Sequence, residues 1–243
     1  MNLKITFYPE SKFGGFSDID GIINFYIRVN SLIETSSIVL DLGCGRGALA
    51  DDKIPLRKNL RILKGKCQKV IGIDVDEFAR MNPFIDEFLL IEGNYFPLPR
   101  HHIDIIVCDS VLEHVEDPEL FFSECHRVLK PEGYLCLKTG NVFSYPGICA
   151  KLIPNKYHTA ILKKIQGDRK EGTIFHVFNR CNTIKKIRNM LSKYGFDHYV
   201  YGYEAEPSYL YFSKLLYWLG TIHQKYAPMI IKPAIFAYAR KLS

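Results

Sequence analysis

Three glycines at alternate positions follow an apolar, β-branched run, and this feature constrains the fold more than any other. The run Ile38–Leu40 leads into Asp41, and Gly43, Gly45 and Gly47 come next. The run predicts a buried strand. The glycines predict a tight turn, because glycine tolerates positive φ and, lacking a Cβ, lets a ligand lie against bare backbone. Doubly wound α/β sheets bind nucleotide-like ligands at such a turn, after the first parallel strand.

The glycines alone do not identify the ligand. Gly43, Gly45 and Ala48 satisfy the G-x-G-x-x-G/A dinucleotide fingerprint, so an NAD-dependent oxidoreductase is one interpretation and a turn without a ligand is another. Asp41 favours a different ligand. A pyrophosphate anion prefers helix N-terminal amides without a nearby acid, whereas a carboxylate two residues before the first glycine suits a ligand with a positive charge.

A second acid stands at the end of the next predicted strand. The segment Lys69–Glu77 contains an apolar run that ends in Asp74. An acid at this place can accept hydrogen bonds from both hydroxyls of an adenosine ribose. After a third short strand, Phe88–Ile91, Asn94 is placed to read the adenine edge and Tyr95 to stack on its face; a plain turn is the alternative, since Asn and Gly are common in turns.

A fourth buried strand is predicted over Ile103–Cys108. It places Asp109 and Ser110 at its carboxyl end, beside the glycine turn. The Asp-Pro pair at 117–118 starts the following helix, with proline at the first helical position. A fifth strand is predicted over Tyr134–Lys138.

Four motifs thus occur in a fixed order: D-L-G-C-G-R-G from Asp41, I-G-I-D ending at Asp74, D-S-V-L-E-H-V-E-D-P from Asp109, and R-V-L-K-P-E-G-Y-L from Arg127. Together they resemble the class I S-adenosylmethionine-dependent methyltransferases, in style closest to the ubiquinone- and menaquinone-biosynthesis and small-molecule branch. The resemblance covers about Ile38 to Thr139, and it makes S-adenosylmethionine the expected cofactor.

The resemblance implies a role for each motif residue. Asp41, Gly43 and Gly45 would hold the methionine end of the cofactor. Asp74 would bind the ribose hydroxyls, and Asn94 with Tyr95 would flank the adenine; the family often has Asp at the position of Asn94, and an amide oxygen can accept in its place. Asp109 and Ser110 would line the site near the sulfonium. The complete predicted cofactor site is Asp41, Gly43, Cys44, Gly45, Asp74, Val75, Asn94, Tyr95, Asp109 and Ser110.

The same resemblance implies a Rossmann-like α/β fold: a mainly parallel seven-stranded sheet in the order 3-2-1-4-5 plus an edge hairpin, with helices on both faces. We expect one domain over residues 1–243. It divides into an N-terminal helix region (1–35), a cofactor-binding core (36–140), a substrate-cap insertion (141–181), a last core helix and strand (182–206), and a basic aromatic helical tail (207–243). Helical spacing predicts a helix over Ile19–Glu34, capped by Asp18 or Asp20. Strand six is predicted over Asp197–Glu204; the sequence does not locate strand seven.

Composition bounds the remaining choices. A chain of 243 residues that is 47% hydrophobic and 24% charged suits one globular α/β domain. Its seven cysteines are scattered with no C-x-x-C pair, which indicates neither a disulfide framework nor a zinc site, and we predict no metal. The N-terminus lacks an apolar signal region and no stretch is long enough to span a bilayer, so we expect a cytoplasmic protein.

Methyl transfer from a sulfonium is an in-line displacement, and positioning supplies much of its rate. A base is needed only when the acceptor is a hydroxyl or a protonated amine. The candidate bases are His114, just after the fourth strand, and His158 and His176 in the cap insertion; Glu113 and Glu204 are weaker candidates. Each of them could instead orient a loop, because histidine also serves structure.

The tail contains five lysines or arginines, eight aromatic residues and no Asp or Glu. Aromatic residues interleaved with cations fit a helix at an anionic membrane interface, such as the inner face of a membrane. They also fit an active-site wall facing an anionic acceptor, or an extension packed on the sheet with solvated lysines. A second basic run, Lys53–Lys66, is interpreted as a solvated face. Nucleic acid is not the expected partner, since the basic residues are dispersed and no RNA-binding motif occurs.

The expected function is methyl transfer to a small-molecule, glycan or lipid-linked acceptor at oxygen. A non-catalytic methyltransferase-like partner subunit is the further alternative.

Overall fold

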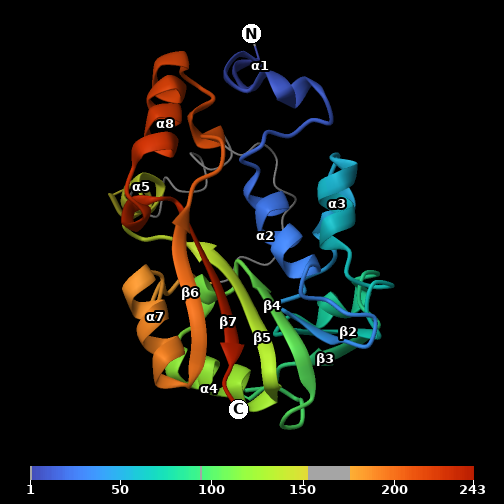
Figure 1. Ribbon diagram of the computed structural model, residues 1–243. Helices are drawn as coiled ribbons and strands as arrows, with labels where there is room; N and C mark the ends of the chain where they lie inside the picture. Colours follow the sequence, from blue (N-terminus) through green and yellow to red (C-terminus); the bar gives the residue numbers. More distant parts are fainter. Residues whose placement is uncertain (1, 94, 153–175) are drawn as a thin grey trace.

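The computed structural model describes residues 2–93, 95–152 and 176–243 (Figure 1). Asn94 and the middle of the predicted cap insertion, including His158, lie outside the described residues. Seven strands form one sheet in the order β3-β2-β1-β4-β5-β7-β6. The strands are β1 Ile38–Leu42, β2 Lys69–Asp74, β3 Glu87–Leu90, β4 Ile103–Asp109, β5 Leu129–Gly140, β6 Phe196–Tyr203 and β7 Ala234–Lys241.

The first five strands pair in parallel, and β7 is antiparallel to both β5 and β6. The fold class and the predicted order 3-2-1-4-5 followed by a hairpin are confirmed. Parallel pairing brings the carboxyl ends of β1, β2 and β4 to one edge of the sheet. The glycine turn, Asp74 and Asp109 therefore meet there, as the order of the motifs predicted.

Helices cover both faces of the sheet (Figure 1). The helices longer than one turn are α1 Leu3–Phe7, α2 Gly21–Asn30, α3 Pro55–Arg61, α4 Pro118–Val128, α5 Tyr145–Leu152, α7 Ile184–Lys193 and α8 Lys214–Tyr226. Alternation along β1 shows how the faces differ: Leu40 and Leu42 pack in the cluster that contains α4 and α7, whereas Val39 packs in the cluster that contains α2. Successive strand residues point to opposite faces, so one buried strand serves two cores.

Two predicted helix starts are confirmed by their caps. The Asp20 carboxylate accepts the N–H groups of Ile22 and Ile23 at the start of α2, and the Asp117 carboxylate accepts that of Leu120 at the start of α4. Each cap pairs amides that the helix itself leaves without a partner. The predicted helix over 19–34 is shorter in the structure, at Gly21–Asn30.

The prediction that the tail is helical throughout is wrong. Residues 214–226 form α8, but the last segment forms β7, inserted between β5 and β6. Ile235, Phe236 and Ala237 are all buried, because β7 carries core residues on both faces. Two of the five tail cations lie on β7 and not on α8. Arg240 forms an ion pair with Glu132, and Lys241 donates hydrogen bonds to backbone carbonyls of α4 and β5.

Strand five is also longer than predicted, running over Leu129–Gly140 with an irregular register opposite Ile103 and Ile105. Among the described residues, no helix has both the length and the apolar character to cross a bilayer.

Candidate active site

The glycine turn is fastened to the end of β2 by backbone hydrogen bonds. The Ile73 carbonyl accepts the N–H groups of Gly43, at 2.8 Å, and of Cys44, at 3.3 Å. The Gly45 N–H donates to Asp74 Oδ2 at 2.9 Å. Gly43 and Gly45 both have positive φ, at 73° and 55°. The two strand ends that the motifs predicted to share a site therefore form one rigid backbone unit.

The two glycines serve different purposes. A Cβ added to Gly43 would collide with the side chain of Val111, so packing requires glycine there. A Cβ added to Gly45 would meet nothing within 4 Å. The backbone at Gly45 thus faces open space, where a ligand can approach the main chain.

Asp41 lies at the end of β1 among other carboxylates. Burial, and next the charge of Asp109, raise the pKa of Asp41 to about 7, with Asp74 adding to the effect and Arg61 opposing it. Because the pKa of this carboxyl is raised, a cation placed beside it would stabilise its ionised form and would itself be bound more tightly. The electrostatics therefore favour a positively charged ligand over a pyrophosphate.

The other two predicted acids are held by specific partners. Asp74 is buried; its Oδ1 accepts the Asp76 N–H at 2.9 Å, and its Oδ2 accepts the Gly45 N–H. A carboxylate oxygen can accept two hydrogen bonds, so acceptor capacity remains for ribose hydroxyls. Asp109 forms an ion pair with Lys138 at 2.6 Å and accepts a hydrogen bond from Tyr26 at 3.3 Å. The sequence analysis did not identify Lys138 or Tyr26 as partners.

Apolar side chains stand exposed around the acids. Val75, Phe78, Met81 and Tyr95 are each more than half exposed. They follow β2 and β3, where the resemblance places the adenine. An exposed aromatic or apolar side chain beside a polar strand end offers a surface on which a nucleobase can stack.

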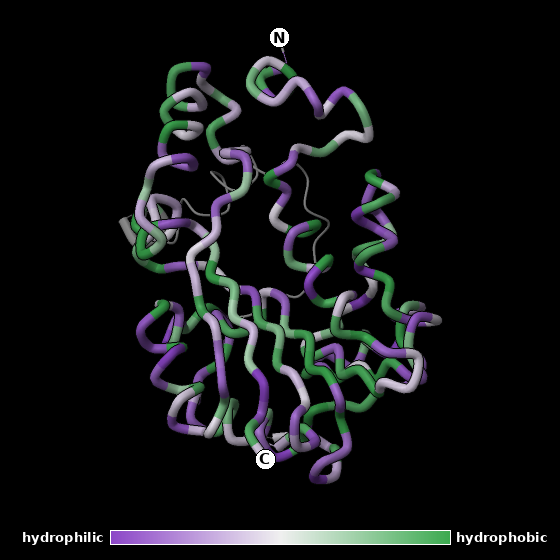
Figure 2. Tube along the Cα trace, in the orientation of Figure 1, coloured by the Kyte–Doolittle hydropathy of each residue, from purple (hydrophilic) through white to green (hydrophobic). Residues whose placement is uncertain are grey.

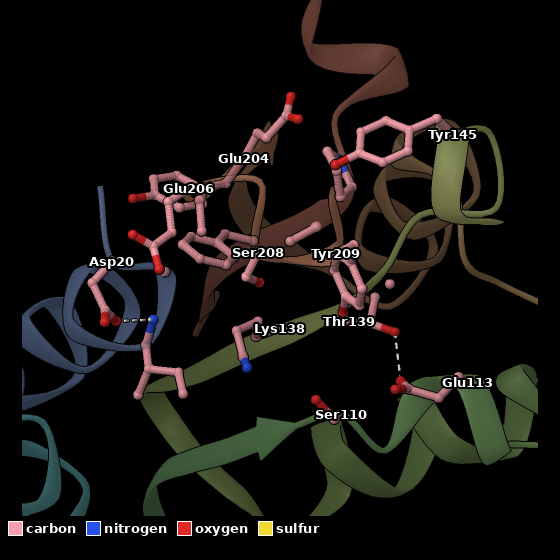
Figure 3. Close-up of a pocket in the computed structure, with 18 of the residues that line it drawn as sticks. Asp20, Ser110, Glu113, Lys138, Thr139, Tyr145, Glu204, Glu206, Ser208 and Tyr209 are labelled. Atoms are coloured by element: carbon pink, nitrogen blue, oxygen red, sulfur yellow. Dashed lines mark hydrogen bonds between the residues drawn. The ribbon is translucent and has the colours of Figure 1, made fainter. Parts of the chain in front are cut away.

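A cavity of about 810 Å³ opens beyond the carboxyl ends of β4 and β5 (Figure 3). Ser110, Glu113 and Lys138 lie on one side of it, and Tyr145, Glu204 and Glu206 lie on the opposite side. The residues that line it come from the region of α2 and α3, from one edge of the sheet (the ends of β5 and β6 and the start of β7), and from the segments after β4, β5 and β6: Asp20, Gly21, Ile22, Arg57, Ser110, Glu113, His114, Lys138, Thr139, Gly140, Tyr145, Val177, Tyr203, Glu204, Ala205, Glu206, Ser208, Tyr209, Pro233, Ala234 and Phe236.

A buried hydrogen-bond chain fixes Glu113 at the cavity. Asn182 Nδ2 donates to Thr139 Oγ1 at 2.6 Å, and the Thr139 hydroxyl donates to Glu113 Oε2 at 2.7 Å. Asn182 and Thr139 are buried. A carboxylate that is oriented from behind by a buried chain keeps a defined geometry toward a substrate.

The structure separates the three candidate bases. His114 lines the cavity, and its Nδ1 lies 2.8 Å from the backbone carbonyl of His176. Since a carbonyl only accepts, Nδ1 carries the proton, and the lone pair of the neutral ring is on Nε2. The side chain of His176 is exposed and packs edge-on against Phe178, 4.4 Å between ring centroids, so His176 positions His114 through its backbone. His158 lies outside the described residues.

A second polar pair at the cavity was not predicted from the sequence. Glu204 Oε2 lies 2.7 Å from His223 Nδ1, and Tyr145 packs edge-on against the His223 ring. Glu204 is buried, which raises its pKa, while His223 lowers it. Glu204 Oε1 has no hydrogen-bond partner among the described residues. No local motif signals this pair, because Glu204 directly follows β6 whereas His223 lies within α8.

The comparisons with known proteins agree with this geometry. A family profile described as "Methyltransferase domain" matches residues 40–137. Residues 40–137, less than half of the chain, are thus similar to a methyltransferase domain. A Mycolicibacterium smegmatis protein named "Probable S-adenosylmethionine-dependent methyltransferase" is 34% identical over 126 residues, which cover 50% of this chain and 44% of that protein. A ubiquinone biosynthesis O-methyltransferase of Thiobacillus denitrificans is 31% identical over 142 residues, 55% of this chain and 56% of that protein.

The chain spans about half the length of the curated relatives it matches. A crystal structure of a SAM-dependent methyltransferase from Archaeoglobus fulgidus superposes with a TM-score of 0.55 at 17% identity, covering 97% of this chain and 99% of that one. This likeness concerns the fold. The family match assigns the glycine turn to a methyltransferase and not to the dinucleotide site that the G-x-G-x-x-A spacing also permitted.

The residues of this methyltransferase domain fit S-adenosylmethionine. The open backbone at Gly45 and the reluctant carboxyl of Asp41 suit its cationic methionine end. The remaining acceptor capacity of Asp74 and the exposed faces of Val75 and Tyr95 suit its adenosine. Of the predicted cofactor residues, only Asn94 lies outside the described part of the chain.

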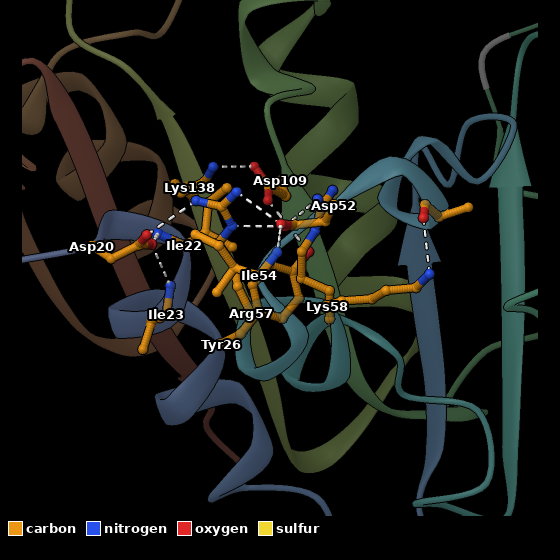
Figure 4. Close-up of polar contacts among 12 residues, drawn as sticks. Asp20, Ile22, Ile23, Tyr26, Asp52, Ile54, Arg57, Lys58, Asp109 and Lys138 are labelled. Atoms are coloured by element: carbon orange, nitrogen blue, oxygen red, sulfur yellow. Dashed lines mark hydrogen bonds and ion pairs between the residues drawn. The ribbon is translucent and has the colours of Figure 1, made fainter. Parts of the chain in front are cut away.

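Ion pairs connect α2 and α3 beside the cavity (Figure 4). Arg57 on α3 contacts Asp52 at 2.7 Å and the helix-capping Asp20 at 3.1 Å. Arg57 therefore holds α3 against the start of α2, next to the Lys138–Asp109 pair. The basic run 53–66 was interpreted as a solvated face, but Arg57 is ion-paired and lines the cavity.

Proposed function

We propose that this chain transfers the methyl group of S-adenosylmethionine to an oxygen atom of a small-molecule, glycan or lipid-linked acceptor. The observation that carries the proposal is the 810 Å³ cavity, which begins at Ser110, directly after the cofactor-side Asp109. Cavities of roughly 300–1,000 Å³ suit small organic ligands or one end of a larger one. Methyl donor and acceptor would then meet at the end of β4.

The groups on the cofactor side of the cavity support an oxygen acceptor. A hydroxyl must lose its proton on methylation, whereas a carboxylate or thiolate needs no base. Glu113, oriented by Thr139, and His114, oriented by the His176 carbonyl, both line the cavity close to Ser110. A relative of this chain is named a ubiquinone biosynthesis O-methyltransferase, which is consistent with an oxygen acceptor on a small molecule.

The roles of the residues follow from their places. S-adenosylmethionine supplies an electrophilic methyl group on a sulfonium. Asp41 would pair with the positive charge of its methionine end, and Asp74 would accept hydrogen bonds from its ribose hydroxyls. Lys138 fixes Asp109 and so the β4 end. Glu113 or His114 accepts the acceptor's proton, and the enclosing walls hold the oxygen in line. Positioning of this kind supplies up to about 7–11 kcal/mol in well-oriented systems.

Two measurements test the proposal in order. Isothermal titration with S-adenosylhomocysteine and with NAD should show binding of the first only. Transfer of radiolabelled methyl to hydroxylated aromatic, glycan and lipid-linked acceptors should then be slowed by Glu113→Gln. The matched control is Glu116→Gln, which removes an exposed carboxylate three residues away that does not line the cavity.

NAD binding without S-adenosylhomocysteine binding would refute the cofactor assignment. Tight S-adenosylhomocysteine binding with no transfer to any acceptor class would refute the catalytic proposal and favour a non-catalytic partner subunit. Equal slowing by both carboxylate variants would refute the role of Glu113.

A further inference from the structure

Helix α8 carries an apolar face on its outer side. Leu215, Trp218, Leu219, Ile222 and Tyr226 are all exposed, with Leu215 at 64% and Tyr226 at 71%. Their spacing of three, four, seven and eleven residues places them on a stripe about 100° wide. Green positions recur along α8 in Figure 2, although this helix stands away from the sheet.

The opposite face of α8 fixes the helix to the protein. Tyr217 and Gly220 are buried, and a Cβ on Gly220 would collide with Pro207 at 2.6 Å. His223 pairs with Glu204. The orientation is therefore set by close packing. Ile222 and Tyr226, although exposed, also line a cavity between α8 and α1, whereas Leu215, Trp218 and Leu219 face outward as a consequence of that packing. A surface helix of a soluble protein ordinarily has its polar residues there.

The stripe continues beyond the helix and has cations along it. Phe212, Met229 and Ile230 are each more than half exposed. Lys214 and Lys225 are exposed on α8, and no Asp or Glu occurs anywhere in residues 207–243. The segment that carries this apolar patch thus contributes only positive charge beside it, which is complementary to a surface with an apolar interior and anionic headgroups.

We propose that α8 lies in the interface of an anionic lipid bilayer, with the stripe of Leu215, Trp218, Leu219, Ile222 and Tyr226 inserted among the lipids. Trp and Tyr concentrate at the level of the headgroups, and leucines bury in the acyl boundary. Lys214 and Lys225 contact the anionic headgroups, each contributing through the negative surface potential. Residues 207–243 supply cations and no carboxylate beside the stripe, and this one-sided charge favours an anionic bilayer over a protein partner.

The bilayer contact lies next to the acceptor cavity. His223 on α8 contacts both Glu204 and Tyr145, and these two residues line the cavity. Resting on the proposed function, this placement indicates that the acceptor is the lipid-linked class, supplied from the plane of the membrane across the inner face of α8.

The experiment uses the full chain, phosphatidylcholine vesicles and equimolar phosphatidylcholine–phosphatidylglycerol vesicles. Trp218 is the single tryptophan of the chain, so its fluorescence reports on the stripe directly. We expect co-sedimentation and a blue shift of Trp218 emission with the anionic vesicles and neither effect with the neutral ones. Lys214→Gln with Lys225→Gln should weaken partitioning about fivefold per charge. Leu215→Ser with Leu219→Ser should weaken it at least as much.

Matched controls come from the far end of the molecule. Leu242→Ser removes an exposed leucine near the C-terminus, and Lys185→Gln removes an exposed cation on α7; both should partition like the parent chain. Circular dichroism checks that each variant is folded. No binding to anionic vesicles, or equal losses in stripe and control variants, would overturn the proposal. A dimer in lipid-free solution that shields Trp218 would overturn it in favour of a second copy.

The readout does not depend on methyl transfer. Vesicle binding by a chain that fails to bind S-adenosylhomocysteine would support the bilayer contact and refute the proposed function. S-adenosylhomocysteine binding and methyl transfer without vesicle binding would support the proposed function and refute the bilayer contact.

Discussion

Replacing Asp41 by asparagine tests the electrostatic basis of the cofactor site. The substitution keeps the shape of the side chain and removes its charge. Burial and Asp109 raise the pKa of Asp41 from an ordinary 3.8 to about 7. Between these two values the folded protein holds a proton that the unfolded chain has lost, so ionising Asp41 makes the folded state less stable as pH rises from about 4 to about 7.

The magnitude follows from the two pKa values. A change from 3.8 to about 7 corresponds to about 4 kcal/mol at pH values above both. Relaxation around the charge reduces this limit, and we expect Asp41→Asn to raise the free energy of unfolding by about 1–3 kcal/mol at pH 8 and to change it little near pH 4. Sites that bind charged ligands commonly carry such a cost in stability.

The same carboxyl predicts the pH dependence of cofactor binding. With a pKa of about 7, Asp41 is about one-tenth ionised at pH 6 and about nine-tenths ionised at pH 8. S-adenosylhomocysteine, which keeps the α-ammonium group, should therefore bind about tenfold more tightly at pH 8 than at pH 6. Methylthioadenosine, which lacks the amino-acid end, should show no such change.

Isothermal titration at both pH values and urea denaturation of parent and variant measure these effects. The Asp41→Asn protein should be more stable at pH 8, should bind S-adenosylhomocysteine weakly, and should lose the pH dependence. The reasoning is refuted if the folded variant binds S-adenosylhomocysteine as tightly as the parent at pH 8. It is equally refuted if the parent's affinity is the same at both pH values.

Four further substitutions probe the turn and the cavity. Gly43→Ala should lower the free energy of unfolding by about 1–3 kcal/mol, because its Cβ meets Val111. Gly45→Ala makes no such collision, but its positive φ is unfavourable for alanine, so it should cost about 1 kcal/mol of stability and in addition weaken S-adenosylhomocysteine binding; denaturation and titration separate the two. Glu113→Gln should reduce kcat by about 10²-fold or more without changing the affinity for S-adenosylhomocysteine, measured by methyl transfer and titration. His223→Ala should cost about 1–3 kcal/mol of stability, more at neutral than at acid pH, because burial raises the pKa of Glu204 and the ionised carboxylate is then left without its partner; Glu204→Gln in the same chain should restore stability in denaturation curves.

The parts of the fold that could be predicted are those set by short segments. The run Ile38–Leu40 and the glycines after it encode a strand and a turn within ten residues, and the Asp-Pro pair at 117–118 encodes a helix start by itself. The neighbourhood of Asp41, Asp74 and Asp109 then follows from parallel strand order alone. The cofactor half of the site is therefore predictable because each of its residues ends a recognisable strand.

The acceptor half could not be predicted in the same way. The sequence places Glu113 next to His114, but the orientation of the Glu113 carboxylate depends on Thr139 and on Asn182, which lies far along the chain. The Glu204–His223 pair depends on how the connection after β6 folds back. Side chains that meet only through tertiary packing leave no local pattern. Histidines were therefore predicted as the leading bases and Glu113 and Glu204 only as weaker candidates, although both carboxylates belong to hydrogen-bonded groups at the cavity.

Strand β7 explains why these two halves differ. It enters the sheet between β5 and β6 and runs antiparallel to both, so that Gly140, Ala234 and Tyr203 come level at one edge. The connection between β6 and β7, residues 204–233, must therefore start and finish at that edge, and it carries Glu204, Tyr209 and α8 there. None of the cofactor residues belongs to it. Changes in its length or composition can alter the acceptor and the membrane contact while Asp41, Asp74 and the glycine turn stay in place, and this separation is what lets one cofactor scaffold serve different acceptors.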